Sequence, residues 1–156
     1  MLEITIPGTE TLRLDYLVLD FNGTLACDGT LLAGVEDGLR HLAQTLAVHV
    51  VTADTFGTAR EALAGIPCEL AILPPGRQDT AKLCYVEHLG AARCACIGNG
   101  RNDRLMLAAA RLSIAVVQGE GAAVETVLAA QVVAPDIQTA LGLLLHPERL
   151  VATLRG

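Results

Sequence analysis

Segments with the apolar pattern of β-strands alternate with segments of helical periodicity along almost the whole chain. The strand-like segments lie at 16–20, 47–52, 68–73, 93–98, 112–117 and 131–134. The helix-like segments lie between and after them, near 35–45, 55–64, 77–89, 102–110, 121–130, 136–145 and 147–154. Such alternation with short connections predicts a parallel sheet with helices on both faces. We therefore expect an α/β fold with a doubly wound, Rossmann-like sheet, preceded by a β-hairpin over 2–7 and 11–15, in one domain spanning 1–156.

The composition excludes several classes of protein. Hydrophobic residues make up 52% of the chain and charged residues 18%, which excludes a disordered polypeptide. The net charge is −6 without a basic cluster, so we expect no nucleic-acid partner. No apolar run is long enough to cross a bilayer and the N-terminus lacks a signal-peptide pattern, so we expect a cytoplasmic protein without a membrane partner. The mean hydropathy of +0.47 is high and predicts a homo-oligomer that buries apolar surface between subunits.

Polar side chains follow the strand-like segments at positions where parallel sheets place their sites. These residues are Asp20, Thr52, Lys82, Asn99 and Asp103. A carboxylate can attack phosphorus, a Mg²⁺ ion shared by carboxylates neutralises phosphoryl oxygens, and a hydroxyl and an ammonium stabilise the transferring group. Lys82 is the only lysine beside ten arginines, which indicates a place that needs a compact point charge. The set therefore predicts phosphoryl-transfer chemistry.

Three stretches of the chain resemble the motifs of a known superfamily. These are DFNGTL (20–25), TAD (52–54) and GNGRNDRLML (98–107). Together with Lys82 they resemble the haloacid dehalogenase superfamily of phosphatases and P-type ATPases, over roughly residues 15–117. The likeness is greatest to the catalytic core of P-type ATPases, with their Asp-Lys-Thr-Gly-Thr and Gly-Asp-Gly-x-Asn-Asp motifs. It implies a phosphatase-type hydrolase that uses Mg²⁺ and an aspartyl-phosphate intermediate on a phosphorylated substrate, either a small molecule or a macromolecule.

The resemblance also implies a role for each matching position. The catalytic group is Asp20 as nucleophile, Asn22, Thr52 and Lys82. The metal ligands are Asp20, the main-chain carbonyl of Asn22, Asn99 and Asp103. The substrate-binding group is Phe21, Gly23, Thr24, Ala53 and Asn102, where Gly23 lets the backbone approach the phosphoryl group and offers its N–H as a donor.

Two positions depart from the superfamily pattern. Asn22 stands where the phosphatases carry a second aspartate, which protonates the leaving group and later activates water. Losing a general acid costs about 10²–10⁴ in rate, but only for leaving groups that need a proton. Asn99 replaces an expected aspartate, so its amide oxygen would bind Mg²⁺ without charge. We therefore expect a hydrolase that favours aryl, acyl or anhydride phosphates over alkyl phosphates.

Alternative interpretations remain open at this stage. The two asparagines are also typical of a regulatory or phosphate-binding module that keeps the fold and has lost turnover. A receiver domain of two-component signalling combines the same residue types, but its reactive aspartate ends the third strand, whereas Asp20 ends the first core strand. The segments 20–52 and 52–82 are too short for a cap or a nucleotide-binding domain, so we expect an open site.

Overall fold

Six parallel strands form the centre of the protein, as the alternating pattern predicts. In the computed structural model, which describes residues 1–54 and 57–156, they are Tyr16–Asp20 (β3), Ala47–Thr52 (β6), Glu69–Ile72 (β7), Cys94–Gly98 (β8), Leu112–Val116 (β9) and Val132–Ala134 (β10). Their order across the sheet is β10-β9-β8-β3-β6-β7. The crossovers between parallel neighbours confirm the doubly wound α/β fold.

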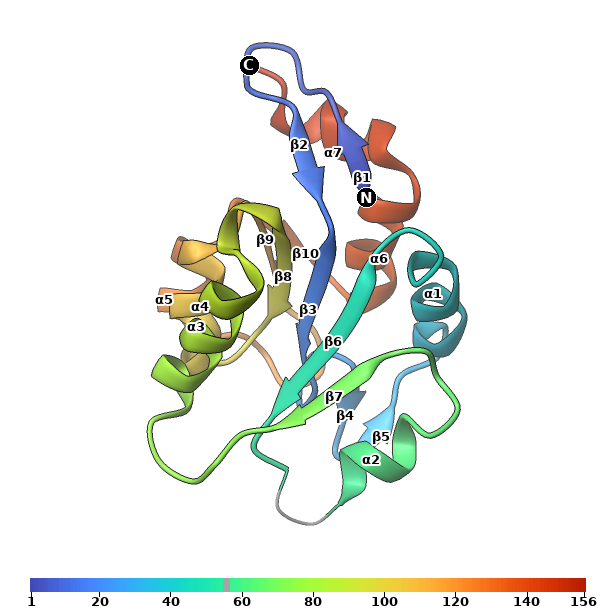
Figure 1. Ribbon diagram of the computed structural model, residues 1–156, viewed down its shortest axis with the longest axis vertical. Helices are drawn as coiled ribbons and strands as arrows, with labels where there is room; N and C mark the ends of the chain where they lie inside the picture. The colour runs from blue at the N-terminus through green and yellow to red at the C-terminus, as the bar shows by residue number, and fades with distance from the viewer. Residues whose placement is uncertain (55–56) are drawn as a thin grey trace.

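Helices cover both faces of this sheet (Figure 1). They are Val35–Leu42 (α1), Thr58–Ala62 (α2), Gln78–Leu89 (α3), Arg104–Ala109 (α4), Val124–Ala129 (α5), Ile137–Leu145 (α6) and Pro147–Leu154 (α7), with 3-10 turns at Ala91–Arg93 (η1) and Arg101–Asp103 (η2). α3, α4 and α5 lie on one side of the sheet, and α1 and α6 lie on the other. The helix predicted near 55–64 includes residues 55 and 56, which lie outside the described part of the chain. The rest of the predicted range contains α2.

Side-chain alternation along β3 explains this layering. Leu17 and Leu19 are buried in the core shared with α1 and α6, whereas Val18 is buried in the smaller core shared with α3 and α4. Successive side chains of a strand point to opposite faces, so Asp20 falls on the same face as Val18. The last residue of β3 is thereby directed to the side of the sheet that α3 covers.

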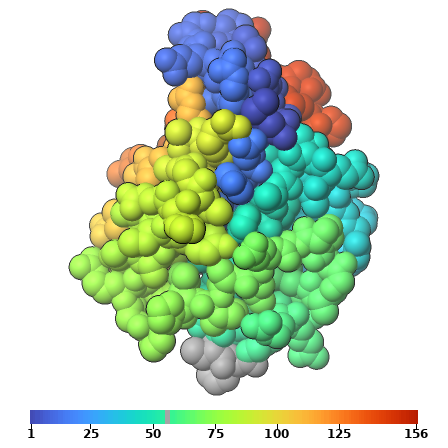
Figure 2. All heavy atoms as spheres, viewed as in Figure 1, coloured from blue at the N-terminus to red at the C-terminus, as the bar shows by residue number. Residues whose placement is uncertain are grey.

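Two hairpins accompany the sheet. The predicted N-terminal hairpin is confirmed as antiparallel Leu2–Ile4 (β1) and Leu12–Leu14 (β2). It stands with α7 at one end of the molecule, opposite the loops that follow the strand ends (Figures 1 and 2). The second hairpin, Ala26–Cys27 (β4) with Thr30–Leu31 (β5), was not predicted because each strand has only two residues.

The connections around the strand ends are short. Between β3 and β6 the chain forms only β4, β5 and α1. These elements are too small to form a cap domain, as the length of this segment predicts. Within residues 1–54 and 57–156, no helix combines the length and the hydropathy needed to cross a membrane.

Candidate functional site

The predicted reactive side chains meet at the carboxyl ends of the central strands. Asp20 ends β3, and Thr52 ends β6 one residue after Val51, the partner of Asp20 in the strand register. Lys82 comes from the second turn of α3, and Asp103 comes from η2 beyond the end of β8. All four of these polar side chains are buried.

A single ammonium group joins the two carboxylates of the site. Lys82 Nζ donates to Asp20 Oδ1 and to Asp103 Oδ1, each at 2.7 Å, and to Asn102 Oδ1 at 3.3 Å. The three donors of an ammonium are therefore all used. Since an unpaired buried charge is costly, this arrangement keeps three charged side chains stable inside the protein.

Burial and charge shift the pKa values of both Asp20 and Lys82. Burial and the Asp103 carboxylate raise the pKa of Asp20 to about 7, against the opposing pull of the Lys82 ammonium. Burial alone would lower the pKa of Lys82, but Asp20 and Asp103 outweigh it and raise that pKa. Lys82 is therefore a cation at neutral pH, and the carboxyl group of Asp20 exchanges a proton near neutrality.

Backbone amides hold Asp103 in place. Its Oδ2 accepts hydrogen bonds from the N–H groups of Asn99 (3.0 Å) and Gly100 (2.9 Å). Gly98 allows this close approach, because a Cβ atom there would lie 2.6 Å from Asp103 Cγ. The glycines of GNGRND thus shape a turn that presents Asp103 Oδ1 to Lys82.

Asn99 lies against the loop that follows Asp20. Its Nδ2 donates to the carbonyl of Gly121 at 3.0 Å, which orients Oδ1 toward Thr24 Oγ1, 3.2 Å away. The Thr24 hydroxyl also lies 3.4 Å from Asp20 Oδ2. Gly23 has φ +80°, and a Cβ atom there would lie 2.3 Å from Asn99 Nδ2, so only glycine fits between the two segments.

Several predicted substrate contacts take a different form in the structure. The N–H of Gly23 donates to Ala26 O at 2.8 Å, so it is not free to act as the phosphoryl donor that we expected. The side chain of Phe21 is buried in the core, which leaves only its backbone near the site. Asn22 exposes its side chain, and Ala53 is half-buried beside Thr52.

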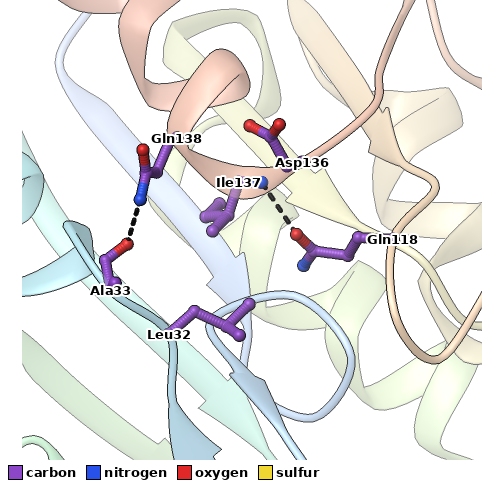
Figure 3. Close-up of a pocket in the computed structure, with 6 residues that line it drawn as sticks. All are labelled: Leu32, Ala33, Gln118, Asp136, Ile137 and Gln138. Atoms are coloured by element: carbon purple, nitrogen blue, oxygen red, sulfur yellow. Dashed lines mark hydrogen bonds between the residues drawn. The ribbon is translucent and has the colours of Figure 1, made fainter.

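Gln118 is part of the site, although it was not among the predicted residues. Its Nε2 donates to the carbonyls of Gly23 (3.0 Å) and Thr24 (2.8 Å), and its Oε1 accepts from the N–H of Ile137 at 2.9 Å. It also lines a pocket of about 290 Å³ with Leu32, Ala33, Asp136, Ile137 and Gln138 (Figure 3). Gln118 follows the end of β9 by two residues, at the same edge of the sheet as Asp20. This position is the sequence feature from which its place in the site could have been predicted.

The donor chemistry of the site fits a hard divalent cation. Asp20 and Asp103 converge on one point, and the oriented Oδ1 of Asn99 and the hydroxyl of Thr24 add neutral oxygens nearby. Oxygen ligands of this kind are those that Mg²⁺ prefers.

Comparison with known proteins identifies a sequence relative and many structural neighbours. No family model matches the chain. An uncharacterized protein of Methanocaldococcus jannaschii is 43% identical over 84 residues, which cover 51% of this chain and 90% of that protein.

Solved structures match over nearly the whole chain. The cobalt-bound deoxy-D-mannose-octulosonate 8-phosphate phosphatase of Haemophilus influenzae has a TM-score of 0.72 at 17% identity, covering 92% of this chain and 94% of that one. The 3-deoxy-D-manno-octulosonate 8-phosphate phosphatase of Moraxella catarrhalis, in complex with magnesium, phosphate and KDO, has a TM-score of 0.72 at 16% identity, covering 92% and 95%. A Streptomyces avermitilis protein assigned to the HAD family of hydrolases has a TM-score of 0.71 at 21% identity, covering 92% and 91%. The chain therefore belongs to the same family as the archaeal protein and has the fold of the haloacid dehalogenase-like superfamily.

Proposed function

We propose that the protein is a magnesium-dependent phosphohydrolase that works through an aspartyl-phosphate at Asp20. The observation that carries this proposal is the buried Lys82 ammonium, 2.7 Å from both Asp20 and Asp103 at the carboxyl edge of the sheet. The fold neighbours that are named as phosphatases of an 8-phosphate support the same reaction class.

Each group of the site has one task in the proposed reaction. An oxygen of Asp20 attacks phosphorus while the bond from phosphorus to the leaving oxygen breaks, and the leaving group keeps that electron pair. Lys82 and the buried Thr52 hydroxyl stabilise the oxygens of the transferring group. Asp20, Asp103, Asn99 and the carbonyl of Asn22 would hold Mg²⁺, which when bound neutralises phosphoryl charge. Water then attacks the phosphorus of the intermediate and releases phosphate and the Asp20 carboxylate.

The side chain at position 22 determines which substrates can react. Asn22 is exposed two residues after the nucleophile, at the position where the superfamily pattern has an acid for the leaving oxygen. An amide cannot transfer a proton to that oxygen, so the leaving group must depart as an anion. Aryl, acyl and anhydride phosphates meet this requirement, whereas alkyl phosphates do not.

We expect sustained phosphate release from acetyl phosphate and 4-nitrophenyl phosphate with Mg²⁺, and slower release from glycerol 3-phosphate. Asn22→Asp should raise the alkyl phosphate rate, by up to about 10²–10⁴ if the new acid is well placed. Steady-state phosphate assays with Asp20→Asn as the blank provide the measurement. Equal rates on aryl and alkyl phosphates would contradict the leaving-group argument, and binding without turnover would favour the regulatory module instead.

Mg²⁺ binding should strengthen as the pH rises through about 7. The raised pKa of Asp20 leaves its carboxyl protonated below that pH, so proton and metal compete for the same oxygen. Calorimetry in buffers of different ionisation enthalpy should show close to one proton released per Mg²⁺ at pH 6 and almost none at pH 8.5. Asp20→Asn should remove the release, and a proton count that does not vary with pH would contradict this prediction.

Gln118 is proposed as a positioning residue for the loop that carries the nucleophile. Its amide fixes two successive carbonyls of that loop, at Gly23 and Thr24, relative to the start of α6. The Asn22 carbonyl, the expected metal ligand, directly precedes this segment. Without the amide, the two carbonyls would lose their partner and the loop would shift relative to Lys82.

Gln118→Leu should therefore lower kcat by about 10–100-fold, because small misplacements near a reacting centre are expensive. Gln138→Leu is the matched control, since Gln138 lines the same pocket and donates to a backbone carbonyl at Ala33 that does not belong to the nucleophile loop (Figure 3). That control should change kcat less than about twofold. Equal losses of kcat in both variants would assign Gln118 a purely structural role.

A further inference from the structure

A second pocket lies beside the proposed reaction centre. It measures about 260 Å³ and is lined by Gln78, Asp79, Arg101, Asn102 and Arg104. Asn102 belongs both to this pocket and to the site, because its Oδ1 accepts from Lys82 Nζ at 3.3 Å. The pocket is therefore joined to the site through the side chain of Asn102.

The same two segments that supply Lys82 and Asp103 form the walls of this pocket. Gln78 and Asp79 precede Lys82 by four and three residues on α3, so they share its face one turn closer to the start of the helix. One helical turn is about 5 Å, which is the span of a few bonded atoms. A substrate whose phosphoryl group contacts Lys82 could thus place a neighbouring group in the pocket.

Among the residues that line the pocket, two carry positive charge, Arg101 and Arg104, and one carries negative charge, Asp79. Arg104 contacts Asp79 at 3.4 Å, and Arg101 contacts Glu125, which lies outside the lining, at 3.2 Å. Each guanidinium carries five N–H donors, and the ion pair with Asp79 uses the Nη2 group of Arg104 only.

Arg104 is the best-placed of these arginines to bind an anion. Its Nε is buried and has no hydrogen-bond partner among residues 1–54 and 57–156, while its side chain stays 40% exposed. Asp79 accepts from the N–H of Thr80 at 2.8 Å, which fixes the carboxylate that orients Arg104. The planar guanidinium group, held in this way, suits a carboxylate or a phosphate.

We infer that this pocket binds a second anionic group of the phosphorylated substrate, so that the substrate class is a phosphate that carries a carboxylate or a further phosphate close to its phosphoryl group. The inference rests on the proposed function, because it takes Lys82 as the phosphoryl contact. Arg104 and Arg101 then act as specificity residues, and Asn102 links the two halves of the binding site.

A matched pair of non-hydrolysable ligands tests this inference by binding rather than by turnover. (3-Carboxybenzyl)phosphonate and (3-carbamoylbenzyl)phosphonate have the same shape and differ in one negative charge. Calorimetry with Mg²⁺ should give about ten-fold or tighter binding of the carboxylate ligand to the native protein. Arg104→Met should remove that preference and Arg101→Met should reduce it. Arg13→Met, on the distant hairpin in an exposed ion pair with Glu3, should preserve it.

The outcomes separate this inference from the proposed function. If both ligands bind the native protein with equal affinity, the phosphoryl site stands and the second anionic subsite is refuted. If neither ligand binds, both the subsite and the phosphoryl site are refuted. If the preference persists in both Arg104→Met and Arg101→Met, the pocket is not where the second anion binds.

Discussion

The interaction on which the rest of the site depends is the buried contact of one ammonium with two carboxylates. Lys82 Nζ lies 2.7 Å from Asp20, which ends β3, and 2.7 Å from Asp103, which follows the neighbouring strand β8. Two buried carboxylates this close to one another repel strongly unless a cation lies between them. The two carboxylates therefore need a positive charge between them to be stable. A divalent cation bound beside Lys82 would further reduce the repulsion between Asp20 and Asp103. Burial, together with the neighbouring Asp103 carboxylate, raises the pKa of Asp20 to about 7.

Much of the fold could be predicted because it depends on local patterns. The bounds of β3 and β6 agree with the apolar runs at 16–20 and 47–52, since buried parallel strands consist almost entirely of such residues. The placement of Asp20, Lys82 and Asp103 at one edge follows from the topology of parallel sheets. The proposed roles of these residues, the single domain and the P-type ATPase likeness stay predictions.

Other features could not be predicted because they depend on contacts between distant segments. Gln118 bonds a carbonyl 95 residues away in the sequence, and no local pattern specifies that contact. The N–H of Gly23 was expected to face the substrate, but the tight turn after β3 uses it for Ala26. The predicted homo-oligomer also remains a prediction, supported by the exposure of Val124 (71%) and Leu128 (79%) on α5. Since the segment between β3 and β6 contains only β4, β5 and α1, we expect loops and helix ends such as η2 and the start of α3 to recognise the substrate.

We propose that Asp20 accepts a phosphoryl group next to a divalent cation, with Lys82 as its counter-ion. A crystal structure of the protein with Mg²⁺ and beryllofluoride is the most direct test. We expect beryllium bonded to an oxygen of Asp20, Lys82 Nζ in contact with a fluorine, and Mg²⁺ bound by Asp20 and Asp103. An unmodified Asp20, with Lys82 still bridging the two carboxylates under saturating ligand, would contradict it.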